Sequence, residues 1–533
     1  MPDILTVYAA SQPDKPAVID DRPGGPVTRW TYAEFEAEAN RLAHTLLSLG
    51  VTPGQNVIWC GPNSAHVMAA ISAIRKVGAV NVPLNYRLTP DEALHVIGHC
   101  DASVAYVDAE HAPVFAALRD RLDRLRHVVV FGGPPPAAAD GTGTHGTGTH
   151  GAWMLGEDVV AAAPAGPPGV SAGSGGASSM IYTSGTTGKP KGAVRSGQAG
   201  GTSVVALIQL IGYQPDDVYL TSGPLYHSGP YGFANGALAL GQTIVVQRRF
   251  DPEDWLRLVH TYRVSSTFSA PAPIRMVCGL PAEVKARYDR SSMKRMVANA
   301  APWSFALKQQ YLADFPADSL WEVYGSTELG VDCVLEPQDQ LRKPGSCGKA
   351  APGVDILLLG ETGAEVTGTG PDHPGELYVR SEGVFDAYYK QQDSYDSARR
   401  GDFHTVGDIA YRDEEGYLYI CDRKNDMIIT GGMNVYPAEV EAALEQHPVI
   451  YEVAVFGIPS PEWGEAVHAT VVLRPGAALS AADVMAHSRE HLAGYKTPRS
   501  VSFAGELPRT GSGKILKRVL RAPYWAADGS RLA

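Results

Sequence analysis

The segment Tyr182–Gly192 has the composition of a phosphate-binding loop. It reads Tyr-Thr-Ser-Gly-Thr-Thr-Gly-Lys-Pro-Lys-Gly and follows a short apolar run. Glycines let backbone N–H groups converge on one anion, and the two lysines add positive charge where a polyphosphate would lie. A Walker A motif is excluded, because only two residues separate Gly185 from Gly188 and Pro190 follows Lys189. The segment therefore predicts a nucleotide triphosphate site of another kind, with a plain surface turn as the alternative.

Three further segments place polar or small residues at the ends of apolar runs. His227, within Pro224–Gly229, could be a base, but a histidine beside a tyrosine is more often packed than catalytic. Val297–Pro302 is small-residue backbone that could lie flat against a planar base. Tyr324–Glu328 combines a ring that could stack on adenine, hydroxyls for phosphate and a carboxylate for Mg²⁺. A helix start explains that last segment equally well on its own.

Two later segments complete the set. Asp408 follows Gly407 and could bind ribose hydroxyls or make an Asx turn. Lys514 ends the glycine-rich segment Pro508–Lys514, which could carry the lysine into a distant site or be a solvated loop. Each segment is weak evidence taken singly.

Composition limits the class of protein. The 533 residues are too many for one core, so at least two domains are expected. With 44% hydrophobic and 19% charged residues, the chain has the composition of an ordinary globular protein. A net charge of −12 argues against nucleic acid as the main partner. No signal peptide and no apolar span of about 20 residues is evident, so no membrane helix is expected.

The six cysteines form no Cys-x-x-Cys pair. Neither a zinc site nor a disulfide framework is therefore indicated, and reduced thiols in the cytoplasm are expected.

Residues 29–131 alternate helix and strand patterns. Thr31 is the expected N-cap of a first helix, with Glu34 completing a capping box, and a second helix is expected at about 64–77. Strands are expected at the segments 56–60, 79–82, 104–107 and 127–131. Strands separated by helices predict a parallel sheet covered on both faces.

The tract 133–177 is rich in proline, alanine, glycine and threonine. It matches Gly-x-Gly-x-x-Gly from Gly141 and from Gly146, but neither match links a strand to a helix. His145 and His150 are weak evidence for a metal in a low-complexity tract. A flexible, solvent-exposed insertion without a catalytic role is expected.

The pattern changes again near residue 425. Pro437 is expected to open a helix that ends near Glu445, strands are expected at 451–458 and 468–474, and a further helix at 480–492. The predicted architecture is an α/β protein. It has a large N-terminal region of mixed and parallel sheets with flanking helices at 1–424, and a small mobile α+β domain at 425–533.

The order of these motifs along the chain resembles the adenylate-forming superfamily, and within it the acyl-CoA synthetases. The phosphate loop is followed by Tyr-Gly-Ser-Thr-Glu, then Gly-Asp, then Asp-Arg-Lys-Asn-Asp, then Thr-Gly-Ser-Gly-Lys. The resemblance covers about residues 29–519. The phrases at 85–88 and 492–496 also look like the fatty-acyl type of bacterial ligase. The resemblance implies two steps, in which a carboxylate attacks the α-phosphate of ATP and coenzyme A then displaces AMP.

The resemblance also implies roles for individual residues. The β- and γ-phosphates would be held by Thr183, Ser184, Gly185, Thr186, Thr187, Gly188 and Lys191. Adenine would be enclosed by Ala300, Ala301 and Tyr324, with Pro302, Gly325 and Ser326 as further nucleotide contacts. Thr327 would touch the α-phosphate and Glu328 would hold Mg²⁺. Asp408 would bind the ribose hydroxyls, and Arg423 would bind the ribose or a phosphate. Lys514 would bridge the carboxylate and the α-phosphate, so Lys514, Thr183 and Glu328 are the expected catalytic residues.

The small domain of this superfamily rotates between the two steps. Asn425 stands at the hinge position, and Gly431 and Gly432 would line the pantetheine tunnel in the second step. Arg195 and Val406 depart from the residues of many relatives at their positions. These departures remove no charged catalytic group, but they change the expected pocket shape and nucleotide affinity.

The acid is not specified by the motifs. The pocket is expected to be lined by His227 to Tyr231, Asn299, and Gly325 to Val331. Small residues among them, such as Ser228, Gly229, Gly232 and Gly330, leave room for a sizeable apolar body. An enzyme of one half-reaction, a peptide-synthetase adenylation domain, a luciferase-like oxygenase and a non-catalytic nucleotide-binding protein are the alternatives. The expected partners are the acid, ATP and coenzyme A, with a homodimer as an open alternative to a monomer.

Overall fold

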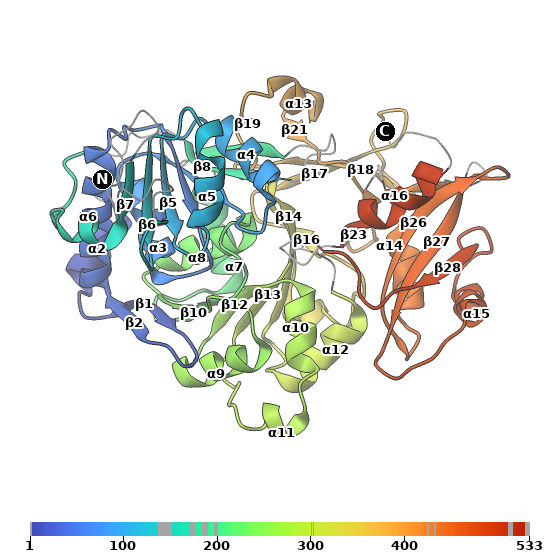
Figure 1. The fold of residues 1–533 in the computed structure, drawn as a ribbon. Helices are drawn as coiled ribbons and strands as arrows, with labels where there is room; N and C mark the ends of the chain where they lie inside the picture. The colour runs from blue at the N-terminus through green and yellow to red at the C-terminus, as the bar shows by residue number, and fades with distance from the viewer. Residues whose placement is uncertain are drawn as a thin grey trace.

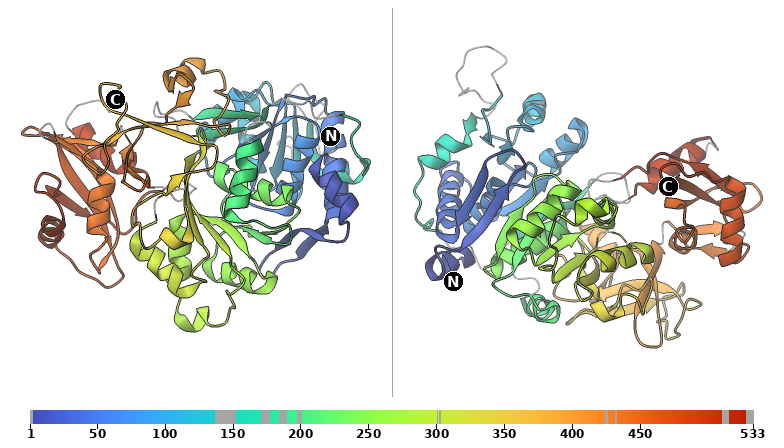
Figure 2. Two further views of the ribbon diagram at one scale, coloured as in Figure 1. Left: turned by 180° about the vertical axis from the view of Figure 1, so that it is seen from behind. Right: turned by 90° about the horizontal axis from the view of Figure 1, so that it is seen from below.

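The computed structural model describes residues 3–136, 152–170, 177–183, 190–196, 201–299, 301, 303–423, 426–430, 433–509 and 515–527. These residues form a large N-terminal body and a smaller C-terminal unit set to one side of it (Figure 1; Figure 2). The body holds three β-sheets, and the C-terminal unit holds a fourth. The predicted α/β fold class is confirmed.

The first sheet of the body is mostly parallel. Its strands are β3 (Asn56–Cys60), β4 (Val80–Leu84), β5 (Val104–Asp108), β6 (His127–Phe131), β7 (Ala152–Leu155), β8 (Ala177–Thr183), β9 (Lys191–Ser196) and β19 (Ala387–Tyr388). Within the described ranges they run in the order β19-β9-β8-β4-β3-β5-β6-β7. Pairing is parallel from β8 through to β7, and antiparallel at β8–β9 and β9–β19.

Helices cover both faces of this sheet, as the sequence predicts. They are α2 (Tyr32–Ser48), α3 (Ala65–Lys76), α4 (Pro90–His99), α5 (Ala112–Leu118) and α6 (Gly156–Ala161). Trp59 of β3 packs in the core that contains residues of α2 and α3, whereas the next residue, Cys60, packs in the core that contains residues of α4 and α5. Thr31 caps α2 with Glu34 in a capping box, as predicted.

The second sheet of the body brings six parallel strands side by side. Its strands are β1 (Pro16–Asp21), β2 (Val27–Thr31), β10 (Val218–Thr221), β11 (Thr243–Val246), β12 (Ser266–Ser269), β13 (Arg295–Ala298), β14 (Leu320–Ser326), β15 (Gly330–Leu335) and β16 (Lys349–Ala350). In the described part of the chain their order is β16-β15-β14-β13-β12-β10-β11-β1-β2. The run β14-β13-β12-β10-β11-β1 is parallel, so its carboxyl ends lie along one edge.

The helices of this half are α1 (Ile4–Ser11), α7 (Gly201–Ile211), α8 (Ser228–Ala239), α9 (Pro252–Tyr262), α10 (Pro271–Cys278), α11 (Ala282–Lys285) and α12 (Phe305–Asp314). No helix among the described residues is long and apolar enough to span a bilayer.

The prediction of a flexible, exposed insertion at 133–177 is wrong for residues 152–161. Residues 152–155 form β7, which extends the parallel sheet beside β6, and α6 follows directly. Val160 is buried, and a Cβ on Gly156 would lie 2.8 Å from the carbonyl oxygen of Val130. The short apolar run Ala-Trp-Met-Leu supplies enough burial for an added strand, although its neighbours have a low-complexity composition. His145, His150 and both glycine-motif matches lie outside the described residues.

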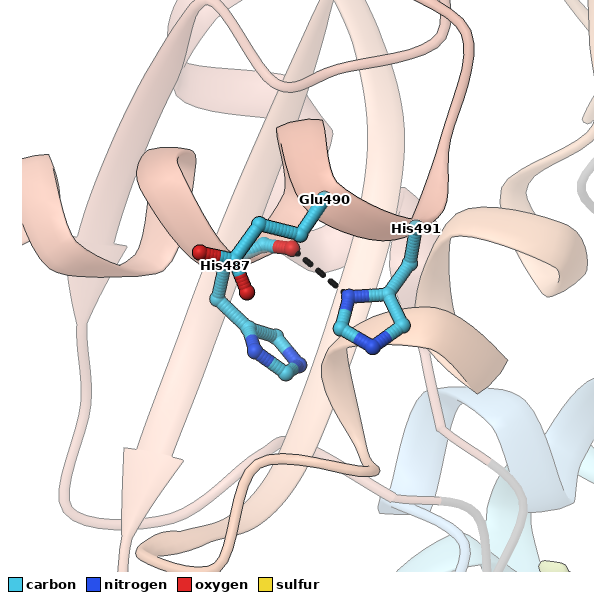
Figure 3. A group of neighbouring side chains, drawn as sticks. All are labelled: His487, Glu490 and His491. Atoms are coloured by element: carbon cyan, nitrogen blue, oxygen red, sulfur yellow. Dashed lines mark hydrogen bonds between the residues drawn. The ribbon is translucent and has the colours of Figure 1, made fainter.

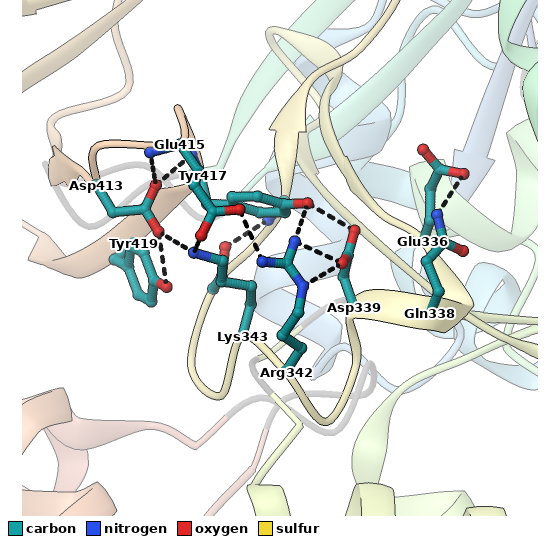
Figure 4. A network of polar contacts seen from close by, with 11 residues as sticks. Glu336, Gln338, Asp339, Arg342, Lys343, Asp413, Glu415, Tyr417 and Tyr419 are labelled. Carbon is teal, nitrogen blue, oxygen red and sulfur yellow. Dashed lines mark hydrogen bonds and ion pairs between the residues drawn. The ribbon is translucent and has the colours of Figure 1, made fainter.

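The third sheet is antiparallel and is joined to the second by a network of polar contacts. It contains β17 (Asp355–Leu359), β18 (Gly375–Arg380), β20 (Arg399–Arg400), β21 (Phe403–His404), β22 (Asp408–Arg412) and β23 (Leu418–Arg423), with α13 (Gln392–Ser397) beside it. Arg342 and Lys343, which follow β15, pair with Glu415 in the β22–β23 turn, as Figure 4 shows.

The C-terminal unit is a compact α+β element, as predicted. Its strands are β24 (Ile428–Thr430), β25 (Met433–Val435), β26 (Ile450–Ser460), β27 (Gly464–Leu473) and β28 (Ser500–Phe503), and its helices are α14 (Pro437–Leu444), α15 (Ala481–His491) and α16 (Lys517–Ala527). Val440, Val455, Val467 and Val484 lie in its core. The boundary near residue 425 stays a prediction, because Asn425 lies outside the described residues.

Candidate active site

One large cavity lies at the carboxyl edge of the second sheet. Its volume is about 1060 Å³. The residues that directly follow four parallel strands line it: Ser222 after β10, Ala270 after β12, Asn299 after β13 and Thr327 after β14. Because loops at the carboxyl ends of parallel strands converge, this edge is the usual ligand site of open α/β sheets.

Most of the described candidate residues line this cavity. They are Thr183, Lys191, His227, Ser228, Gly229, Asn299, Gly325, Ser326, Thr327, Glu328 and Gly330. Asp408 lies two residues beyond Val406, which also lines the cavity. Arg423 is the cross-strand partner of Asp408 on β23. Ala301 is half-buried and does not line the cavity.

The remaining candidates lie outside the described residues. They are Ser184, Gly185, Thr186, Thr187, Gly188, Ala300, Pro302, Gly431, Gly432 and Lys514. Arg509, five residues before Lys514 in the sequence, lines the cavity.

Glu328 joins the two large sheets at the cavity wall. Its Oε1 accepts hydrogen bonds from the Thr183 hydroxyl on β8, at 3.0 Å, and from the Tyr388 hydroxyl on β19, at 2.9 Å. Its side chain is 9% exposed. The carboxylate of the Tyr-Gly-Ser-Thr-Glu motif and the first hydroxyl of the phosphate loop therefore meet, although 145 residues separate them in the sequence.

The β14–β15 turn that carries Glu328 requires its glycines. A Cβ on Gly325 would lie 1.9 Å from the carbonyl oxygen of Gly330, and Gly330 has φ of +93°. Ser326 Oγ accepts from the Leu329 N–H at 3.0 Å, and Thr327 Oγ1 lies 2.7 Å from Ser228 Oγ at the start of α8. This turn presents hydroxyls and a carboxylate on a rigid backbone.

Tyr324 donates a short hydrogen bond to Asp408. Burial, and then the charge of Asp408, raise the pKa of Tyr324 well above its usual value. The phenol therefore stays protonated and fixes the position of the Asp408 carboxylate.

His227 lies in the cavity wall, in surroundings that favour the uncharged imidazole. Burial, and then the charge of Arg87, lower its pKa to about 4. Its ring packs on Tyr226 at a centroid distance of 4.4 Å, and Nε2 has no hydrogen-bond partner within the described ranges. These contacts favour a packing role for His227 over a role as general base. The sequence favours the same interpretation.

The sequence marks Arg195 only as a departure that affects the expected pocket shape, and it gives Tyr388 no role. Arg195 on β9 lines the cavity and donates two hydrogen bonds to the carbonyl oxygen of Thr327, at 3.0 and 2.6 Å, and one to that of Gly383. It therefore fixes the motif turn from the neighbouring sheet. No local sequence pattern marks these contacts, because they join residues that are 132 and 188 positions apart.

Asp332 on β15 is a further missed residue. It is the extra residue of a bulge, because Tyr324 pairs with Cys333 while Gly325 pairs with Val331. Its carboxyl group is fully buried, and neither oxygen has a hydrogen-bond partner in the described part of the chain. Burial, and then the charge of Asp408, raise its pKa well above the usual range.

Part of the cavity lining, called the apolar chamber below, is apolar. Leu207, Ile208, Phe233, Phe268, Met276, Val331 and Val354 contribute to its walls. On α8, Gly232 and Gly236 face open space, since a Cβ on either would meet no atom within 4 Å. The cavity lining thus combines polar residues such as Glu328 with the apolar chamber.

Comparisons with known proteins agree with this arrangement. Residues 5–389 match the AMP-binding enzyme family, and residues 439–514 match the AMP-binding enzyme C-terminal domain. A feruloyl-CoA synthase of Amycolatopsis sp is 35% identical over 94% of this chain and 95% of its own. A long-chain-fatty-acid–CoA ligase of Mycobacterium tuberculosis is 32% identical over 93% of this chain and 94% of its own.

A solved structure extends the likeness to the whole fold. The anthranilate CoA ligase AuaEII in complex with anthranoyl-AMP superposes with a TM-score of 0.87 at 25% identity, over 99% of this chain and 97% of that one. The fold and site define an adenylate-forming enzyme. The chain belongs to the AMP-binding enzyme family.

Proposed function

We propose that this enzyme is an ATP-dependent, AMP-forming acyl-CoA ligase. A carboxylate oxygen bonds to the α-phosphorus of ATP as pyrophosphate leaves, and the thiolate of coenzyme A then attacks the acyl carbon as AMP leaves. The observation that carries this proposal is the meeting of Thr183 and Glu328 in a cavity whose lining includes the apolar chamber. Such a reaction needs no nucleophile from the protein, only positioning and charge stabilisation.

The described residues have distinct proposed roles on the nucleotide side. Asp408, held by Tyr324, would bind the ribose, and Thr327 would contact the α-phosphate. Glu328 would hold Mg²⁺, whose charge would offset that of the phosphates. Two hydroxyl donors fix Oε1 of this carboxylate, and carboxylate oxygen is a ligand that Mg²⁺ prefers. Lys514 would stabilise the adenylation transition state.

The proposed acid has a bulky apolar body, aromatic or aliphatic. A cavity of about 1060 Å³ is at the upper end for small-molecule sites, and much of its lining is apolar. The relatives named above act on a feruloyl group and on long-chain fatty acids, so both shapes occur among similar chains. Gly232 and Gly236 keep one wall free of side chains.

A panel of carboxylic acids tests this proposal through pyrophosphate release and thioester formation. Bulky apolar acids should exceed acetate in kcat/KM by at least about tenfold. Equal turnover of acetate would contradict the substrate class, and absence of pyrophosphate release with every acid would contradict the ligase.

A change at Gly232 tests the chamber itself. Gly232→Val should raise KM for the largest acids by roughly tenfold while acids of small volume change little, because the valine fills open space along α8. Gly98→Val on α4 is the matched control, since Gly98 is also a helical glycine facing open space and does not line the cavity. A similar loss in both variants would show that the effect arises from the helix and not from the chamber.

An enzyme of one half-reaction is the second candidate. ATP–pyrophosphate exchange with and without coenzyme A separates the two, because thioester formation from supplied adenylate without exchange would favour the half-reaction. A cytoplasmic location is proposed from the six free cysteines. The homodimer stays a prediction.

A further inference from the structure

The helix α15 carries two histidines and a glutamate on one turn. His487, Glu490 and His491 each place one possible ligand atom within 4.8 Å of the others (Figure 3). Their spacing of three and four residues puts them on one face of the helix. Glu490 and His491 are exposed and His487 is half-buried, so the cluster is open to solvent. None of the three lines the large cavity.

Backbone carbonyls already orient both imidazoles. Nε2 of His487 lies 3.2 Å from the carbonyl oxygen of Ala443, and Nδ1 of His491 lies 2.9 Å from that of His487. A carbonyl oxygen only accepts, so these ring nitrogens carry the hydrogen. In the neutral rings the lone pairs are left on Nδ1 of His487 and on Nε2 of His491. A hydrogen bond from the second nitrogen to a carbonyl is the usual support of a metal-bound histidine.

A third histidine restrains the His487 ring. His447, just after α14, packs against it at a centroid distance of 5.0 Å and an interplanar angle of 90°. Nδ1 of His447 accepts from the Val449 N–H at 3.4 Å. The rings of His487 and His491 lie 4.5 Å apart. The two candidate ligands are therefore held close together from more than one element.

The carboxylate of Glu490 has no hydrogen bond or ion pair within the described ranges. Figure 3 shows its side chain directed back along the helix toward His487. A carboxylate without a counter-charge beside two imidazole lone pairs is a donor set that suits zinc and its neighbours in the divalent series. It differs from the oxygen donors expected for Mg²⁺ at Glu328.

We propose that His487, Glu490 and His491 form a binding site for a divalent transition-metal ion of the zinc class on the C-terminal unit. Water completes the coordination, because the cluster faces solvent. The site is separate from the nucleotide and acyl cavity and takes no part in the reaction there.

Metal titration of the full-length, untagged, EDTA-treated protein tests the site, with the absorbance of Co²⁺ and the heat of Zn²⁺ binding as readouts. One equivalent should bind to the wild type. The double variant His487→Gln/His491→Gln should bind at least about tenfold more weakly, and so should Glu490→Gln, whose exposed side chain can be changed without risk to the fold. With excess Mg²⁺ and no added transition metal, adenylation should be the same in all three proteins.

The matched control is His95→Gln/His99→Gln. These histidines are also four residues apart on a helix, α4, with stacked rings 5.5 Å apart, but no carboxylate joins them in a three-ligand group among the described residues. This variant should still bind one equivalent of the metal ion, as the wild type does. The proposal is overturned if the wild type binds no ion, if Mg²⁺ displaces Zn²⁺ from the site, or if the His487/His491 and Glu490 variants bind as the wild type does.

Discussion

Two junctions in this molecule are both made by basic side chains that pair with carboxylates, but one junction is fixed and the other can separate. The junction between the second and third sheets is made by Lys343, which contacts both Asp413 and Glu415, and by Arg342, which also contacts Glu415 (Figure 4). Backbone hydrogen bonds between Cys347 or Gly348 and Leu418 run through it. Separation of these sheets would leave several charges and backbone groups unpaired, so this junction is fixed.

The junction between the body and the C-terminal unit centres on one buried carboxylate. Arg275 of α10 donates to Glu452 at 2.7 Å, and its guanidinium lies over the ring of Tyr451. Arg509 of the C-terminal unit also pairs with Glu452. When the unit moves away, Arg509 still neutralises Glu452, so no buried charge is left without a partner. This junction can therefore separate at small cost, as the proposed rotation of the small domain requires.

The largest expected effect separates the two half-reactions. Lys514→Ala should slow adenylation by about 10²- to 10³-fold, since it removes a charge that acts only in that transition state. Thioester formation from supplied adenylate should change far less, because the small unit has then moved. Single-turnover rates of each step measure this, and equal losses in both would contradict the assignment of Lys514.

At the fixed junction a single hydroxyl should matter for stability. Tyr417 is buried, donates to Asp339 at 2.7 Å and accepts from Arg342 at 2.7 Å. Tyr417→Phe should lower the free energy of unfolding by about 1–2 kcal/mol, because two polar groups lose a partner. Urea denaturation measures the change, and a neutral result would show that water replaces the hydroxyl.

At the separable junction the matching change should affect turnover instead of stability. Arg275→Ala should slow adenylation by about two- to fivefold, because the docked form loses one hydrogen-bonded ion pair while Glu452 keeps Arg509 as a partner. Its melting temperature should stay near that of the wild type, since Arg509 still pairs with Glu452. Arg287→Ala, which removes an exposed pair with Glu253, is the control and should change neither quantity.

The smallest expected effect is a pH dependence of stability at the junction between the body and the C-terminal unit. Burial, and then the carboxylates of Glu441 and Glu452, raise the pKa of Glu445 to about 7, against the opposing charges of Arg275 and Arg509. The packed form thus favours the neutral acid, so its stability falls as the pH rises from about 4.5 to 7. Glu445→Gln should gain stability relative to the wild type over that range. If the difference in melting temperature between Glu445→Gln and the wild type did not vary with pH, the predicted loss of wild-type stability at rising pH would be contradicted.

The sequence predicts much of the scaffold because its signals are local. The capping box at Thr31 and the short apolar runs of β3 to β6 depend on neighbours a few residues away. The strand β7 was missed because four apolar residues beside a low-complexity tract are too few to stand out. Their pairing with β6 comes from the tertiary structure.

The candidate site also has features that the sequence predicts and features that only the fold shows. The order of the motifs predicts that Thr183 and Glu328 belong to one site, but only the fold shows their hydrogen bond. The contacts of Arg195, the bond from Tyr388 and the buried carboxyl of Asp332 depend on pairings between distant segments, for which one sequence holds no signal. Local patterns thus indicate which residues can do chemistry, and the sheets decide which of them meet.

The most direct test of the two-junction account is a pair of distance measurements by spin labels, in a background with Cys421→Ser. Labels at Ala317 and Ala478 span the separable junction, and labels at Ala317 and Thr362 span the fixed one. The first distance should change between the protein with ATP and acid and the protein with acyl-adenylate and coenzyme A, while the second stays constant. Identical distances across both junctions in both states would contradict the account.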